Sequence, residues 1–260
     1  MKPNWRKLCL PLLLACGFAA VAHSQTPVAN RKKVIEDARQ AYYSLRVEGL
    51  DEFRATVKPN WELVLKDQAG LKLLNGLHFS MLLDRKDKVT VTHHADVEPS
   101  NEQQRQGFDQ IFSGMDQAIN GFFATWELFM LNSPLPTADS EYKLEDLGTQ
   151  YRLAYKDGAA DVVTMMGKNL IITDINVTSK DFASSVRPQF VHTAKGFVLA
   201  GYDADYKPTS GPGVVKLTIK IDHKPVSGLQ LPVGLVMDSV MDGAPTHMEL
   251  AFSEHEVKSH

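Results

Sequence analysis

The middle of the chain carries a long helical pattern of apolar positions, in residues 105–131. At about 100° per residue, its apolar side chains fall within an arc of about 140°, and Asp109, Asp116 and Glu127 fall on the other side. The arc contains Phe108, Ile111, Phe112, Met115, Ala118, Ile119, Phe122, Phe123, Trp126, Phe129 and Met130. The pattern predicts an amphipathic helix packed against a sheet, because a membrane span would not segregate its charges so cleanly.

One flank of this helix carries only small side chains, namely Gly114, Ala118, Gly121 and Thr125. Each glycine inside a helix costs about 1 kcal/mol relative to alanine. We therefore expect a backbone or a ligand to approach closely along this flank.

The first part of the chain alternates between helical and extended patterns. Helical spacing predicts a helix over 28–47, with Thr26-Pro27 at its start and Gly49 as its stop. The alternation of residues 53–58 then predicts a short strand. A second helix is expected over 61–75.

A hairpin and a polar link precede the long amphipathic helix. The runs FSMLLD and VTVTHH flank RKDK, which predicts two paired strands over 78–94. Residues 94–105 are polar and are expected to form a linker with a helix start at its end.

From Glu141 onward, runs of five to nine or more residues are separated by turn signals such as KDGA, GKN and AKG. Several runs alternate, as in Val215, Leu217, Ile219 and Ile221, which is typical of antiparallel strands with one packed face. The predicted fold is α+β, with an antiparallel meander of about 9–11 strands that packs one face. The absence of a strand-helix-strand rhythm disfavours a doubly wound nucleotide-binding fold.

The chain opens with a pattern typical of an export signal. Lys2, Arg6 and Lys7 precede the apolar run 8–22, and Ala22-His23-Ser24 is a small-x-small cleavage site. We expect residues 1–24 to be removed between Ser24 and Gln25, leaving 25–260 as a single periplasmic or secreted domain. The alternative is a lipobox at Leu13-Leu14-Ala15-Cys16, which would leave a lipid-anchored Cys16.

Composition excludes several classes of site and partner. Both cysteines, Cys9 and Cys16, precede the favoured cleavage point, so the mature chain would hold no disulfide or thiolate site. A net charge of -3 with interspersed signs gives no basic stripe, so nucleic acid is not an expected partner. No later segment reaches the roughly 18 apolar residues of a membrane helix.

Metal and catalytic motifs are weak. In HHADVE (93–98), the adjacent His93 and His94 would point to opposite faces of a strand, so no metal site is predicted. The C-terminal HEVKSH lacks the spacing of a zinc protease, and no GxSxG motif occurs. No cofactor or enzymatic activity is expected. A secreted hydrolase would require several of five histidines to meet in one cleft: His78, His93, His192, His223 and His247.

The order of these segments resembles a known superfamily. An export signal, a helix, the link GLDE, the strand opening FRATV, further helices and a long antiparallel series resemble the LolA-like outer-membrane lipoprotein carriers and the MucB/RseB-type periplasmic sensors. The closing LQLPVGLVMDSVMDGAPTHMELAFSEHEVK is also similar to the end of such chains. The chain as a whole is similar to a secreted family of acidobacterial type. No functional residue is carried over, because Pro59-Asn60-Trp61 departs from the carrier pattern.

The resemblance implies a curved antiparallel half-barrel sheet wrapped on the N-terminal and central helices. It also implies an apolar space between sheet and helices that receives acyl chains. We therefore expect a non-enzymatic cell-envelope protein that binds a lipid or lipoprotein acyl chain between helix 105–131 and the sheet. The candidate lining is Phe108, Phe112, Met115, Ile119, Phe122, Phe123 and Trp126. Two alternatives remain open: these side chains form only a core, or the protein is an envelope interaction or sensor protein without a cavity.

Overall fold

The computed structural model describes residues 30–63, 65–210 and 213–260. Within them, three α-helices and a short 3-10 helix accompany one antiparallel sheet of 12 strands. The helical elements are α1 (Arg31–Ala41), η1 (Trp61–Leu63), α2 (Gln68–Leu74) and α3 (Glu102–Met130). The strands are β1 (Leu50–Pro59), β2 (Leu77–Leu83), β3 (Val89–Ala95), β4 (Tyr142–Asp146), β5 (Gln150–Asp157), β6 (Ala160–Gly167), β7 (Ile172–Thr178), β8 (Phe182–Thr193), β9 (Gly196–Pro208), β10 (Val215–Val226), β11 (Leu229–Met241) and β12 (Ala244–Ser259).

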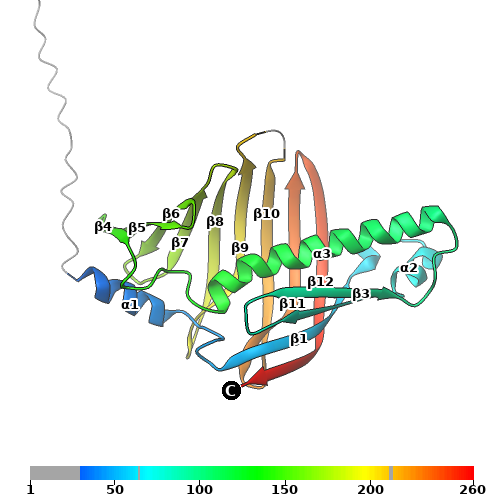
Figure 1. Ribbon diagram of the computed structural model, residues 1–260, viewed down its shortest axis with the longest axis horizontal. Helices are drawn as coiled ribbons and strands as arrows, with labels where there is room; N and C mark the ends of the chain where they lie inside the picture. The colour runs from blue at the N-terminus through cyan, green and yellow to red at the C-terminus, as the bar shows by residue number, and fades with distance from the viewer. Residues whose placement is uncertain (1–29, 64, 211–212) are drawn as a thin grey trace, which may run out of the picture.

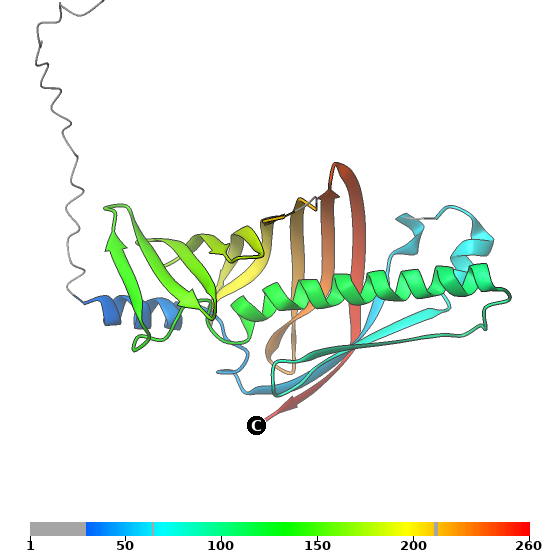
Figure 2. The same ribbon diagram turned by 45° about the horizontal axis from the view of Figure 1, so that its top comes forward.

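The sheet is open, and α3 crosses one of its faces. Its strand order is β3-β2-β1-β12-β11-β10-β9-β8-β7-β6-β5-β4, so β3 and β4 are the two edges. Strands β9 to β11 run across α3, whereas β2 and β3 run almost along it, so the sheet curves around the helix (Figures 1 and 2). Helix α1 lies at the β4 end of the sheet, and α2 lies at the other end.

The amphipathic pattern of residues 105–131 is confirmed by α3. Asn101 caps the helix, because its side chain accepts a hydrogen bond from the backbone N–H of Gln104. Eight of its apolar side chains are buried: Phe108, Met115, Ile119, Phe122, Phe123, Trp126, Phe129 and Met130. Asp109 and Asn120 are exposed on the opposite side. The packed side of this helix lies where the sequence predicts, whereas Asp116 and Glu127 on the predicted polar side are half-buried.

The first helix is shorter than predicted. Helix α1 ends at Ala41, because Tyr42 leaves it to enter the core. The Tyr42 hydroxyl donates to the Leu170 carbonyl (2.9 Å) and accepts from the Ile172 N–H (2.7 Å). The predicted boundary at 47 was wrong because these long-range hydrogen bonds outweigh local helix propensity. The Thr26-Pro27 start lies outside the described residues.

The other predicted elements are found with local corrections. Strand β1 and the β2–β3 hairpin confirm the two extended patterns at 53–58 and 78–94. The helix expected over 61–75 is present only in part, as η1 and α2, with Asp67 capping α2. The structure has 12 strands where about 9–11 were predicted from the sequence.

Of the helices in the described part of the chain, none has the length and hydropathy needed to cross a membrane. The predicted export signal, its cleavage point at Ser24–Gln25 and the alternative anchor at Cys16 all lie outside the described residues.

Candidate functional site

The side chains predicted to line a ligand space are mostly part of the hydrophobic core. Ile119, Phe123 and Trp126 have no exposed area and belong to the core. Phe123 packs against Phe53 and Phe252, with ring centroids 6.0 and 5.9 Å apart. Met115 and Phe122 are also buried. Along this stretch, the face of α3 is filled by protein side chains.

Phe108 and Phe112 lie nearer the start of α3 and border a small hollow. Its volume is about 310 Å³, and its other lining residues are Ala95, Val97, Glu98, Pro99, Arg105 and Asp109. The ring of Phe112 stacks on His93, with ring centroids 4.1 Å apart. Of the seven predicted lining residues, these two border open space.

The small-residue flank of α3 does not approach another element. A Cβ atom placed on Gly114 or Gly121 would have no atom within 4 Å besides its local helix. Both glycines are exposed. The prediction of a close backbone approach along this flank was therefore wrong for these two positions.

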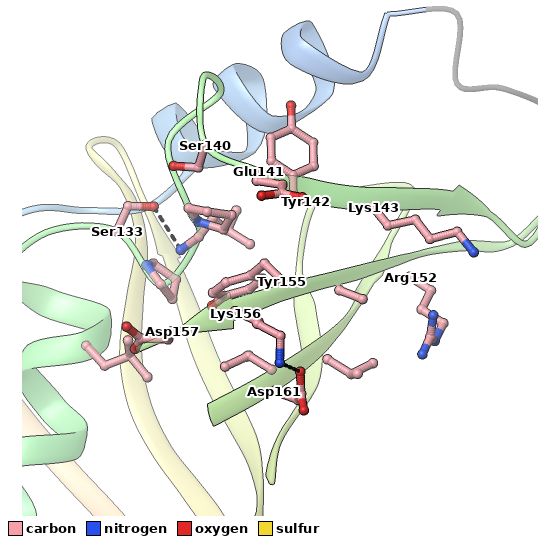
Figure 3. A pocket seen from close by; sticks show the side chains of 17 residues that line it. Ser133, Ser140, Glu141, Tyr142, Lys143, Arg152, Tyr155, Lys156, Asp157 and Asp161 are labelled. Atoms are coloured by element: carbon pink, nitrogen blue, oxygen red, sulfur yellow. Dashed lines mark hydrogen bonds and ion pairs between the residues drawn. The ribbon is translucent and has the colours of Figure 1, made fainter. Parts of the chain in front are cut away.

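A larger groove lies at the β4 end of the sheet, past the C-terminal turn of α3. Its volume is about 940 Å³, within the range of about 300–1,000 Å³ that is usual for small-molecule sites. Its walls come from Leu128 at the end of α3, from the connection 133–141, and from β4, β5 and β6 (Figure 3). The groove is therefore assembled from one continuous part of the chain, residues 128–163.

The apolar part of the groove centres on a row of side chains. Tyr142, Tyr155 and Val162 are register partners on β4, β5 and β6, so they lie side by side on one face of the sheet. Further apolar lining comes from Leu128, Pro134, Leu135, Pro136, Ala154 and Val163. Burial raises the pKa of the Tyr155 phenol, which keeps it a neutral hydrogen-bonding group.

Charged side chains form the other part of the lining. Lys156 and Asp161 are register partners joined by an ion pair of 2.7 Å (Figure 3). Lys143 and Arg152 both contact Glu145, at 2.6 and 3.1 Å. Alternation along β5 and β6 places Lys156 and Asp161 on the opposite side of the strands from the tyrosine row. The groove is thus lined from both sides of these strands.

The connection that forms one wall is fixed by hydrogen bonds. The Ser44 hydroxyl donates to the Leu131 carbonyl (2.7 Å), and the Arg39 guanidinium donates to the Leu135 carbonyl. Further along, the Tyr142 hydroxyl donates to the Ala138 carbonyl (3.2 Å). These contacts hold the wall in place without a ligand, so the groove is largely pre-formed.

The groove could not be found by the helical pattern that located α3. Its lining comes from a helix end, a proline-containing connection and three strands within 128–163, and no single helical or alternating period spans these segments. The available local signal is the pair of prolines in SPLP, Pro134 and Pro136, which favours an extended connection between α3 and β4.

The five histidines that a hydrolase would have to gather have different neighbours. His223 accepts a hydrogen bond from the Trp126 indole, His192 lies against Phe197, and His93 stacks on Phe112. His247 pairs with Asp238, and His78 pairs with Asp96. This arrangement gives the hydrolase alternative no support.

Comparisons of the chain with protein-family models, with curated proteins and with solved structures found no match.

Proposed function

We propose that the protein is a non-enzymatic, exported cell-envelope protein that binds the acyl chain of a lipid or lipoprotein. The observation that carries the proposal is the groove of about 940 Å³ beside Tyr155, with apolar side chains such as Leu128 and an ion pair of Lys156 with Asp161 in its lining. The proposal includes a LolA-like half-barrel fold, which the curved sheet around α3 supports. We place the acyl chain in this groove, past the end of α3. The sequence had predicted a position along the middle of α3, where side chains such as Phe123 and Trp126 are buried in the core.

The chemistry of the two linings suits an amphipathic ligand. An acyl chain in contact with the exposed Leu128 and the half-buried Tyr155 would gain about 0.8 kcal/mol for each methylene removed from water, whereas Tyr142 and Val162 are themselves buried. The row of Lys156 and Asp161 lies on the solvent side, where a polar head group can exchange hydrogen bonds with it.

A second candidate function is binding of an envelope protein through a sheet edge. The edges β3 and β4 each present one side that pairs with no other strand of the described sheet. Such edges accept an added strand from a partner. This alternative predicts no lipid binding, and it would be favoured by cross-links from a partner to residues 89–95 or 142–146.

Lipid binding is tested on the purified protein by two measurements. Mass spectrometry of an organic extract detects a co-purified lipid, and titration with a fluorescent fatty acid measures saturable binding. We expect one saturable site. Absence of both a co-purified lipid and saturable binding would contradict the proposal.

The position of the site is tested with two matched leucines. Leu128 borders the groove and Leu63 lies in η1, and both are 42% exposed. Leu128→Asp should weaken fatty-acid binding by about tenfold, since it removes roughly 1.5 kcal/mol of apolar contact and adds a charge. Leu63→Asp should leave binding unchanged. If Phe112→Asp weakens binding and Leu128→Asp does not, the ligand occupies the smaller hollow near the start of α3.

A further inference from the structure

The hairpin of β2 and β3 brings together three side chains with metal-binding groups. His78 and His94 are register partners, and their rings stack with centroids 4.6 Å apart. Asp96 follows β3 by one residue, and its carboxylate lies 2.7 Å from His78 Nε2 and 4.0 Å from His94 Nε2. The three ligand atoms all lie within 4.8 Å of one another.

We propose that His78, His94 and Asp96 form a binding site for a divalent transition-metal ion of the Zn²⁺ type. This proposal is independent of the acyl-chain groove, which lies at the other edge of the sheet. Zn²⁺ binds imidazole nitrogen and carboxylate oxygen at about 2.0–2.2 Å, which places ligand atoms about 3.3 Å apart in a tetrahedral site. The separations of the three ligand atoms in the structure, from 2.7 Å up to 4.8 Å at most, span that spacing.

The pairing of β2 with β3 explains why the motif HHADVE alone does not predict this site. His93 and His94 point to opposite faces of β3, as the sequence predicts: His93 stacks on Phe112 of α3, whereas His94 faces His78. The second imidazole therefore comes from the paired strand and not from the neighbouring residue. A histidine pair across two antiparallel strands has no fixed spacing in the sequence, which is why HHADVE alone predicts no site.

The site is open to ions and to further ligands. The side chains of His78, His94 and Asp96 are 39%, 71% and 58% exposed. Three protein ligands leave at least one position of a tetrahedral ion for water or another donor. Bound metal would also tie Asp96, at the start of the connection to α3, to strand β2. We therefore expect metal to stabilise the fold as well as to bind.

The test is calorimetric titration of the tag-free full chain with ZnCl₂, together with thermal unfolding in the presence and absence of Zn²⁺. One equivalent should bind, and it should raise the unfolding temperature by mass action. His94→Ala and Asp96→Asn should each weaken binding by at least about tenfold and should remove the thermal shift. His192→Ala, an exposed histidine on β8, is the matched control and should behave like the wild type.

Three results would overturn the proposal. The first is that the wild type shows no saturable Zn²⁺ binding. The second is that His94→Ala binds Zn²⁺ as tightly as the wild type. The third is that only His247→Ala, which alters the separate pair of His247 and Asp238, loses binding. Because His94 is exposed on an edge strand, His94→Ala is expected to fold. Its circular dichroism spectrum verifies this before titration.

Discussion

At the scale of single residues, His223 shows how packing sets protonation. The Trp126 indole N–H donates to His223 Nε2 over 3.2 Å, so this nitrogen must be unprotonated. Burial lowers the pKa of His223 to about 4. The neutral imidazole is therefore part of the contact between α3 and β10.

This contact predicts a loss of stability in acid. In the unfolded chain His223 has a pKa of about 6.5, so between pH 6.5 and 4 the unfolded state binds more protons and stability falls as the pH falls. The total loss should be about 3 kcal/mol below pH 4. Urea unfolding at several pH values measures it. His223→Gln, which retains an acceptor for Trp126, should flatten this part of the profile, and an identical profile would contradict the assignment.

Glu127 predicts a pH effect in the other direction. Burial, with the charges of Asp87 and Asp84, raises its pKa to about 7, although Arg46 opposes the shift. Because the folded pKa lies above the unfolded value, the folded state is disfavoured as the pH rises from 4.5 through 7.

Replacing this carboxyl should remove the penalty. Glu127→Gln should raise the unfolding temperature at pH 8 relative to wild type and should have a smaller effect at pH 5. Thermal unfolding followed by circular dichroism measures both. Destabilisation at pH 8 would show that the ionised carboxylate stabilises the fold.

At the scale of elements, the exposed flank of α3 predicts a gain in stability. Since nothing contacts a Cβ placed at Gly114 or Gly121, alanine at either position should add up to about 1 kcal/mol to the free energy of unfolding. Denaturant titration of the two single variants measures this. A loss of stability would mean that another molecule or segment covers this flank.

Gly201 on β9 provides the opposite case. A Cβ at this position would overlap the Ile219 carbonyl oxygen of β10. Gly201→Ala should therefore destabilise the sheet by roughly 1–3 kcal/mol, the usual cost of overpacking. The same denaturant titration measures it, and an effect within error of zero would show that β9 and β10 can separate slightly at this point.

At the scale of the whole molecule, the sequence predicts patterns with a fixed period better than contacts between distant segments. The packed face of α3 and the β2–β3 hairpin follow from the spacing of residues such as Phe122 and Phe79. The end of α1 does not, because Tyr42 leaves the helix to bind Leu170 and Ile172. The groove does not follow from one period either, since Leu128 belongs to a helical pattern and Tyr155 to the alternating pattern of β5.

The proposed acyl-chain site past the C-terminal end of α3 can be tested directly. The direct measurement is photo-crosslinking with a fatty acid that carries a diazirine on its chain, followed by peptide mapping by mass spectrometry. We predict saturable labelling of peptides within 128–143 and 152–163, and its loss on competition with unlabelled fatty acid. Labelling confined to 108–126, or labelling that does not saturate, would contradict the assignment of the groove as the binding site.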